Sequence, residues 1–201
     1  MAKAQPKHKS TMHMDTSIRC IQINLQHSKA ATHNLIQTIE EGDMDIVFAQ
    51  ELYTIQNKLV GIPRTYKTFI SGRGKTRAAI ILINDKIDAI LINQLSDEDM
   101  VVVEITTSRS RFFTISMYLD ILQELENDTK KMGGVLHYTR GKGVIIGMDS
   151  NSRSRSWYDT VTNTRGIILE EFLAGKQLHM LNEESDSTTY KIAEEPVMWI
   201  L

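Results

Sequence analysis

The chain has 201 residues, 41% of them hydrophobic and 24% charged, which are ordinary values for one globular domain. Its formal net charge of −2 argues against a generic binder of polyanions, and its one cysteine, Cys20, excludes an intrachain disulfide framework. No apolar run approaches the roughly 20 residues that span a bilayer, and the first residues lack the apolar stretch of a secretory signal. These features predict a soluble intracellular protein that does not enter a membrane.

Charged residues are unevenly distributed along the chain. Basic residues gather in segments 64–77 and 140–155, and acidic residues gather in segments 40–45, 97–104 and 183–186. A nearly neutral protein with such clusters can present one positive face to a phosphate backbone. Solvated loop charges explain any single cluster at least as well, so the clusters alone do not decide between the two interpretations.

The predicted elements alternate between strands and helices. Residues 1–17 are polar and are predicted to form a flexible tail, and the periodicity then predicts a strand (18–25), a helix (30–40) and a strand (45–49). Short segments of β type, separated by turn-forming residues, follow at 66–70, 78–83, 89–92, 100–106 and 111–117. The last elements are a helix (121–131) closed by Gly133-Gly134, a strand (143–148), a helix (165–174) that ends at Gly175 and a strand (177–181). The pattern predicts one α/β domain over residues 18–190, with several antiparallel strands.

Polar residues stand at the ends of four predicted strands. Asn24 ends the first strand, Glu51 follows the second, Tyr118 follows strand 111–117, and Asp149 and Asn151 follow strand 143–148. Rigid strands that deliver side chains at a common edge are how α/β enzymes assemble a site. Each residue alone also has a structural explanation, such as a turn for Asn24, solvation for Glu51, a helix cap for Asp149 and the rim of the core for Tyr118. The ordered set favours a catalytic site.

Four motifs occur in a fixed order, QINLQHS at 22–28, AQE at 49–51, SMY at 116–118 and GMDSN at 147–151. In this order they resemble the endonuclease/exonuclease/phosphatase superfamily. The SRSRSW run at 152–157 and STTY at 187–190 are similar to the apurinic-like endonuclease domain of insect non-LTR retrotransposons that target ribosomal DNA. The resemblance extends from residue 18 to residue 190.

The resemblance implies an α/β fold, a four-layer sandwich of two mixed sheets flanked by helices, that hydrolyses phosphodiester bonds with Mg2+ or Mn2+. Glu51 and Asn24 would bind the cation, which prefers hard oxygen ligands. Asp149 would orient or deprotonate the attacking water, and Asn151 would position the water and the phosphate. Tyr118 would donate its hydroxyl to a phosphate oxygen. Glu51 therefore counts both as a metal ligand and as a catalytic residue.

The resemblance also implies a double-stranded DNA substrate and a nuclear location. Arg153 and Arg155 directly follow the Asp149–Asn151 motif, which makes them candidates to bind the DNA backbone near the cut. Arg73 and Lys75, in a loop with glycines, are further DNA-binding candidates.

One departure from the family pattern concerns the C-terminal end. The family has a late Asp and a Ser-Asp-His element whose histidine contacts the scissile phosphate, and this chain has neither. After Tyr190 the pattern stops, so residues 191–201 are predicted to be an atypical tail and the C-terminal strands of the second sheet are expected to be missing. An open sheet edge would promote self-association, and the loss of the histidine would leave nicking weak or absent.

Two alternative functions stay open. A phosphatase-like or sphingomyelinase-like member of the superfamily would use the same residues on a different phosphate, although the SRSRSW run argues against it. A non-catalytic DNA-binding remnant would retain the fold and the basic residues without cleaving DNA.

Overall fold

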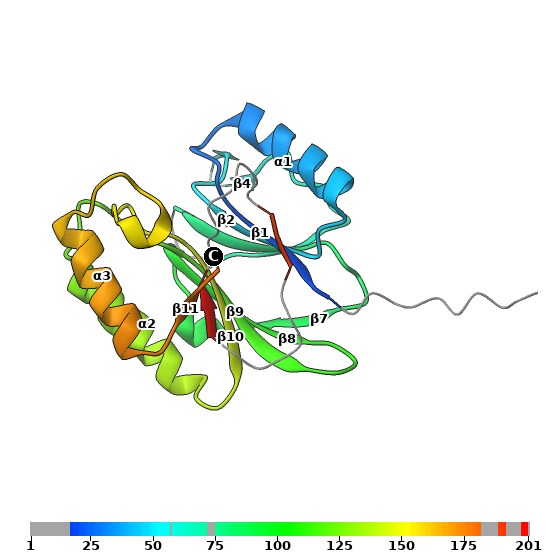
Figure 1. The fold of residues 1–201 in the computed structure, drawn as a ribbon. Helices are drawn as coiled ribbons and strands as arrows, with labels where there is room; N and C mark the ends of the chain where they lie inside the picture. The colour runs from blue at the N-terminus through cyan, green and yellow to red at the C-terminus, as the bar shows by residue number, and fades with distance from the viewer. Residues whose placement is uncertain (1–16, 57, 72–74, 182–188, 192–197, 201) are drawn as a thin grey trace, which may run out of the picture.

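The computed structural model describes residues 17–56, 58–71, 75–181, 189–191 and 198–200. Two mixed β-sheets pack face to face, with helix α1 (Lys29–Gly42) on the outer side of one and helices α2 (Leu125–Tyr138) and α3 (Thr164–Gly175) on the outer side of the other (Figure 1). This is the four-layer α/β arrangement that the sequence predicts. None of the described helices is long and apolar enough to cross a membrane.

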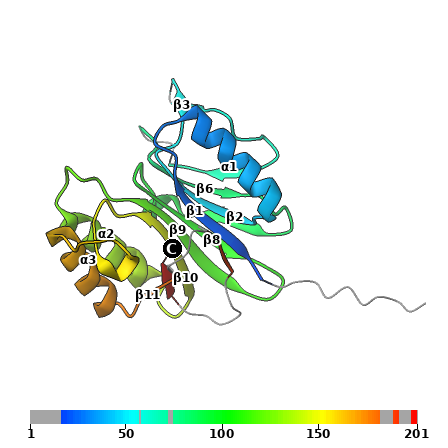
Figure 2. The ribbon, with the colours of Figure 1, turned by 45° about the horizontal axis from the view of Figure 1, so that its top comes forward.

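The first sheet has the strand order β12-β1-β2-β6-β5. Its strands are β1 (Arg19–Asn24), β2 (Ile46–Gln50), β5 (Lys67–Phe69), β6 (Ala78–Leu82) and β12 (Thr189–Lys191). Only the β1–β2 pair is parallel, as the helix between them requires, and the other pairs are antiparallel. Helix α1, which lies across this sheet (Figure 2), begins after Ser28, whose side chain accepts a hydrogen bond from the backbone N–H of Ala31.

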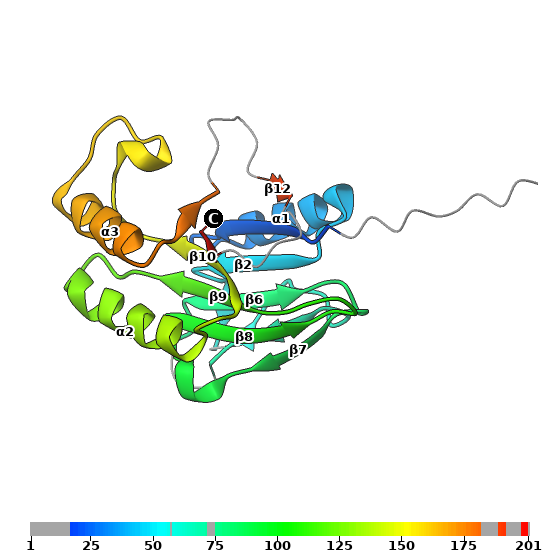
Figure 3. The same ribbon diagram turned by 60° about the horizontal axis from the view of Figure 1, so that its bottom comes forward.

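The second sheet has the strand order β11-β13-β10-β9-β8-β7. Its strands are β7 (Asp88–Leu91), β8 (Met100–Thr106), β9 (Arg111–Tyr118), β10 (Gly143–Asp149), β11 (His179–Met180) and β13 (Met198–Ile200). Strands β9, β10, β13 and β11 run parallel, and β7, β8 and β9 form an antiparallel meander. Helices α2 and α3 pack against each other beside this sheet (Figure 3).

Four shorter elements lie outside the two sheets and the three long helices. They are the hairpin strands β3 (Thr54–Ile55) and β4 (Lys58–Leu59) and the 3-10 turns η1 (Asn93–Leu95) and η2 (Arg155–Trp157).

Alternation along the strands produces three separate apolar layers. In β2, Phe48 points to the core between the sheets, whereas its neighbours Val47 and Ala49 point to the core under α1. A third core lies between the second sheet and helices α2 and α3. The two sheets lie close together at Gly147 of β10, where an added Cβ would lie 2.3 Å from the Cβ of Phe48. Packing in the sandwich therefore fixes the distance and orientation between the strands of the two sheets. This determines where the polar residues at the strand ends lie.

Two predictions from the sequence are wrong. Gly133-Gly134 does not close the second helix, since α2 begins four residues later than expected, at Leu125, and continues to Tyr138. The helix passes through both glycines because Met132, Val135 and Leu136 are buried in the core between α2 and its sheet.

The C-terminal strands of the second sheet were expected to be missing, but one of them is present beside β10. Strand β13 comes from the segment predicted to be an atypical tail, pairs in parallel with β10, and has β11 on its other side. That edge of the second sheet is therefore the two-residue strand β11, and self-association stays a prediction.

Candidate active site

The ends of the central strands of both sheets meet at one end of the sandwich. Strands β1 and β2 are parallel with Asn24 opposite Gln50, and strands β9 and β10 are parallel with Tyr118 opposite Asp149. The Nδ2 of Asn24 donates a hydrogen bond of 2.5 Å to Oδ2 of Asp149, which connects the two sheets directly. The common edge expected from the sequence therefore exists, although it is made of two sheets rather than one.

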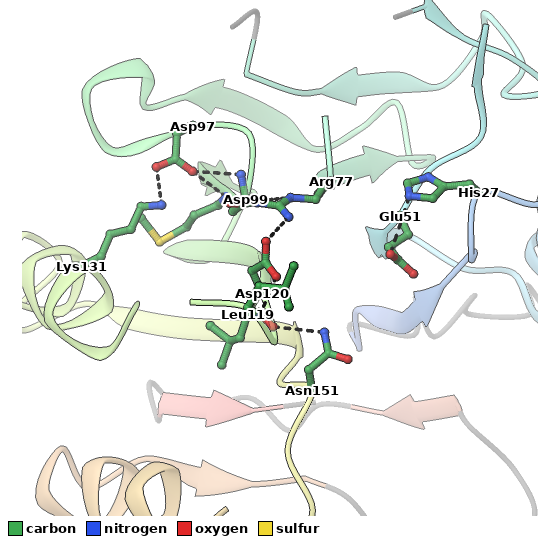
Figure 4. Close-up of polar contacts among 11 residues, drawn as sticks. His27, Glu51, Arg77, Asp97, Asp99, Leu119, Asp120, Lys131 and Asn151 are labelled. Atoms are coloured by element: carbon green, nitrogen blue, oxygen red, sulfur yellow. Dashed lines mark hydrogen bonds and ion pairs between the residues drawn. The ribbon is translucent and has the colours of Figure 1, made fainter. Parts of the chain in front are cut away.

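Asn151 completes the β10 end of the site. Its backbone N–H donates to Oδ1 of Asp149 at 3.1 Å, and its Nδ2 donates to the backbone oxygen of Leu119 at 3.0 Å (Figure 4). Leu119 directly follows Tyr118, which lies opposite Asp149 in the register of β9 and β10. Asn151 has a φ of +44°, a left-handed conformation that asparagine adopts more readily than most residues. These contacts place Asp149, Asn151 and Tyr118 in one polar cluster.

Glu51 lies directly after β2 and also has a left-handed backbone, with a φ of +48°. Its backbone N–H donates to the oxygen of Arg77 at 2.8 Å, and its backbone oxygen accepts from the N–H of His27 at 2.7 Å. Its carboxylate lies 3.6 Å from Nε2 of His27 (Figure 4), and Nδ1 of His27 lies 3.1 Å from the backbone oxygen of Leu52. Non-glycine residues in sparsely populated backbone regions concentrate at functional sites, and Glu51 and Asn151 are two such residues.

Tyr118 lies between the two parts of the site. Burial raises the pKa of its hydroxyl, and the charge of Glu51 raises it further, with smaller effects from Asp149 and Asp120. The hydroxyl therefore stays protonated above the pH at which a free tyrosine ionises. Both carboxylates are therefore close enough to Tyr118 to influence its ionisation.

Beneath the strand ends, Gln50 connects the sheets through the buried core. Its side chain is fully buried, and its Nε2 donates to Oγ of Ser116 at 3.0 Å and to the backbone oxygen of Gly147 at 3.2 Å. Its Oε1 accepts from Nε2 of Gln22 at 2.6 Å. A fully buried amide with this many partners fixes the spacing of β2, β9 and β10 under the site.

Sequence reasoning assigned no role to four charged residues that the structure places at the site. They are His27, Arg77, Asp99 and Asp120. Only His27 had a local signal, because it lies in the QINLQHS motif. The partners of Arg77 lie 22 and 43 positions away in the sequence, and no spacing rule links residues at such separations.

The DNA-binding candidates have different surroundings. Arg153 is already paired, since its Nη2 lies 2.8 Å from Oδ1 of Asp159 and its Nε donates to both carboxylate oxygens. This hydrogen-bonded pair lowers the pKa of Asp159 to about 2. Arg155 and Lys75 are exposed to solvent, and Arg73 lies outside the described residues. Arg155 is therefore the arginine of this loop that is more accessible to a phosphate.

The donor set at the site is compatible with a hydrated divalent cation. Among the residues that the structure describes, no group of three or more His, Cys, Asp or Glu side chains could hold a metal ion. Glu51 supplies a carboxylate, and Oδ1 of Asn24, which accepts the N–H of Gln26 at 2.7 Å, has a second lone pair. One or two carboxylates plus waters are what Mg2+ usually takes, whereas Zn2+ sites need three or four protein ligands.

Comparisons with known proteins agree with this arrangement. A family model described as "Endonuclease-reverse transcriptase" matches residues 112–198. The endonuclease domain of TRAS1, a telomere-specific non-LTR retrotransposon, is similar in structure with a TM-score of 0.74 and 27% identity, covering 87% of this chain and 81% of that domain. TDP2 from D. rerio, in a complex with a single-strand DNA product, is similar with a TM-score of 0.53 and 17% identity, over 81% of this chain and 66% of TDP2, which supports the fold alone.

Two curated relatives come from R1-type elements. The putative 115 kDa protein of the type-1 retrotransposable element R1DM in Drosophila melanogaster is 23% identical over 178 residues, which are 85% of this chain and 17% of the relative. The Pol polyprotein of element R1 in Bradysia coprophila is 24% identical over 154 residues, 68% of this chain and 15% of the relative. This chain thus spans less than a fifth of the length of either. These comparisons support an endonuclease domain of the non-LTR retrotransposon type.

Proposed function

We propose that this domain is a metal-dependent endonuclease that nicks double-stranded DNA. The observation that carries the proposal is the hydrogen bond between Asn24 and Asp149, which brings the ends of four strands from two sheets to one site. DNA as the substrate is supported by the likeness to the endonuclease domain of TRAS1. A DNA target also makes the nucleus the expected place of action.

Each residue of the site has a role that follows from its contacts. Glu51 and Asn24 would hold Mg2+ or Mn2+, which when bound supplies charge stabilisation to the phosphate. Asp149 is held by the Asn24 amide and by the backbone N–H of Asn151, which fix the orientation of its carboxylate. It would take a proton from the attacking water. Tyr118 keeps its proton at neutral pH and donates to a phosphate oxygen as negative charge grows.

Asn151 connects Asp149, the proposed proton acceptor, with the chain beside Tyr118, the proposed hydrogen-bond donor to the phosphate. Its backbone N–H bonds to Asp149, and its side chain bonds to the backbone oxygen of Leu119, the residue after Tyr118, so both groups are held to the same segment. Pre-set geometry of this kind lowers the entropic part of a reaction barrier. The exposed Arg155 and Lys75 would bind the DNA backbone.

The test is a nicking assay on supercoiled plasmid with Mg2+, with Mn2+ and with a chelator. Glu51→Gln and Asp149→Asn should each lower the rate by on the order of 100-fold or more, because each removes a group that acts on the reacting phosphate or water. The variant Glu41→Gln changes an exposed glutamate at the end of α1 and serves as the matched control. Nicking that is unaffected by chelator or by Glu51→Gln would refute the proposal.

The same variants separate the two alternatives. Glu51-dependent release of phosphate from monoesters, without nicking, would identify a phosphatase-like enzyme. DNA binding without cleavage under any metal condition would identify a binding remnant. The SRSRSW loop favours the nuclease, since two arginines beside the catalytic motif are suited to a phosphate backbone rather than to one small phosphate ester.

A further inference from the structure

Arg77 lies directly before β6, between the Glu51 side and the Tyr118 side of the site. Its backbone oxygen accepts the N–H of Glu51 at 2.8 Å, and its own N–H donates to the oxygen of Glu98 at 2.7 Å. The left-handed turn at Glu51 therefore depends on the position of the Arg77 backbone. Arg77 thus contacts the backbone of Glu51, the proposed metal ligand.

The side chain of Arg77 extends to the other side of the site. Its guanidinium makes a two-pronged ion pair with Asp99, in which Nη2 lies 2.5 Å from Oδ2, and its Nη1 lies 2.5 Å from Oδ2 of Asp120. The guanidinium carbon lies 5.1 Å from the ring centroid of Tyr118, within the range of a cation–π contact. Figure 4 shows Arg77 between Asp99 and Asp120.

Asp99 and Asp120 are both held in place by hydrogen bonds that involve the backbone. Asp99 accepts the N–H of Tyr118 through its backbone oxygen at 2.8 Å, and its N–H donates to Oδ1 of Asp97 at 2.9 Å. Asp120 accepts the N–H of Leu122 at 2.9 Å, and this bond, followed by the pairing with Arg77, lowers the pKa of Asp120. The guanidinium therefore sits in a rigid cradle, and lysine has neither its planar fork nor its number of donors.

This network lies at the rim of the site and not in the core. The side chains of Arg77, Asp99 and Asp120 are 18%, 13% and 16% exposed. Removing one partner of such a largely buried ion pair lowers stability, because it leaves unpaired charge. Without Arg77, Asp99 and Asp120 would stand unpaired beside Tyr118, where an incoming phosphate would be repelled.

We infer that Arg77 is a positioning residue: its backbone carbonyl holds Glu51, and its guanidinium fixes the Tyr118 ring and offsets the charges of Asp99 and Asp120. It thereby sets the distance and orientation of the Tyr118 hydroxyl relative to the Glu51 carboxylate. The expected effect on catalysis rests on the proposed endonuclease function. The positioning of Tyr118 rests on its contacts with Arg77 and Asp99 alone.

The experiment compares Arg77→Met and Arg77→Lys with Arg111→Met. Arg111 is a matched control because it also forms an ion pair, with Glu104, but lies at the opposite end of β9 from Tyr118. Single-turnover nicking rates should fall roughly 10- to 100-fold in Arg77→Met, because the Tyr118 hydroxyl, a proposed donor to the phosphate, loses its fixed position. Arg77→Lys should recover only part of the rate, and Arg111→Met should match the parent.

A double-mutant cycle with Tyr118→Phe separates positioning from simple destabilisation. If Arg77 acts through the Tyr118 hydroxyl, Arg77→Met should cost much less in the Tyr118→Phe background than in the parent. Equal losses in both backgrounds, or a loss that follows the melting temperature, would overturn the inference.

A readout independent of nicking keeps this inference distinct from the proposed function. NMR spectra of protein with isotopically labelled tyrosines report on the Tyr118 ring, whose signals are assigned by their loss in Tyr118→Phe. These signals should shift in Arg77→Met and stay in place in Arg111→Met. Unchanged Tyr118 signals in Arg77→Met would overturn the inference even if the enzyme nicks DNA. Shifted signals in a protein without nicking would leave the positioning intact and refute the endonuclease proposal alone.

Discussion

Asn24 and Asp149 lie 125 positions apart and on different sheets, yet the Nδ2 of Asn24 donates a 2.5 Å hydrogen bond to Oδ2 of Asp149. The same carboxylate accepts the backbone N–H of Asn151 through its other oxygen. Each oxygen of Asp149 thus has one donor from a different strand end. The orientation of the proposed proton acceptor therefore depends on the packing of the two sheets against each other.

Asn24→Ala should slow nicking by about 10- to 100-fold, since it removes one of the two donors that orient Asp149 and one oxygen offered to the cation. Nicking under single-turnover conditions measures the change. Asn127→Ala, at an exposed position of α2, is the control and should have no effect. Parent-like nicking by Asn24→Ala would show that Asp149 needs no donor from β1.

Arg155→Ala should weaken binding to duplexes of any sequence, because Arg155 is exposed beside the site and has the charge to contact a phosphate. The slope of log affinity against log salt should fall by about one, as one lost phosphate contact requires. Arg153→Ala should have a smaller effect, since Arg153 is paired with Asp159. Fluorescence anisotropy at several salt concentrations measures both.

Arg140 provides the control for this prediction. It is exposed in the turn before β10, whereas the site lies after the other end of that strand. Arg140→Ala should leave the salt slope unchanged. An unchanged slope in Arg155→Ala as well would show that the SRSRSW loop does not contact the phosphates.

The sequence predicted the strands well because their signals are local. The apolar run expected at 143–148 corresponds to β10 (Gly143–Asp149), and Asn24, Glu51 and Tyr118 stand at strand ends as expected. Sheet order and helix ends depend on distant packing, which is why α2 continues through Gly133-Gly134 and why β13 pairs with β10.

Side-chain partners were the least predictable part of the site. Arg77 could be noted only as one member of a basic segment, because its pairing with Asp99 and Asp120 arises when three separate loops meet at the strand ends. The pairing of Arg153 with Asp159 likewise depends on the fold of the loop before α3, so sequence alone favoured both arginines as DNA ligands equally.

Gly147→Ala should destabilise the domain by roughly 1–3 kcal/mol, the usual cost of overpacking a core. An added Cβ would lie 2.3 Å from the Cβ and 2.4 Å from the Cγ of Phe48, so the two sheets would have to separate. Because Asp149 lies two residues further along β10, nicking should fall as well. Chemical denaturation and nicking measure the two effects.

Gly134→Ala is the matched control for Gly147→Ala. Gly134 lies inside α2, and an added Cβ would meet no atom within 4 Å. Alanine is favoured over glycine in a helix by about 1 kcal/mol, so this variant should be more stable than the parent. A neutral Gly147→Ala variant would mean that the sheets are further apart at Phe48 than the structure shows.

Asp128→Asn should raise the melting temperature at pH 7 by roughly 2–4 °C, equivalent to about 1 kcal/mol for a domain of this size. Asp128 is 7% exposed in α2, and among the described residues its Oδ2 has no hydrogen-bond partner. Burial raises the pKa of its carboxyl, so the ionised form is unfavourable in the folded protein. A neutral amide of similar shape removes that penalty.

The pH dependence of this gain has a definite sign. Because the folded-state pKa of Asp128 is raised, the penalty is fully present at neutral pH and disappears as the pH falls through that pKa towards the unfolded value of 3.8.

Asp159 provides the opposite case, since its pKa is lowered to about 2 and its stabilisation is present above 3.8 and lost between 3.8 and 2. Asp159→Asn should therefore lower the melting temperature at pH 7, and Asp128→Asn should raise it. Melting curves between pH 3 and pH 7 measure both, and a gain in Asp128→Asn that persists below pH 3.8 would mean that the charge of Asp128 is not its cause.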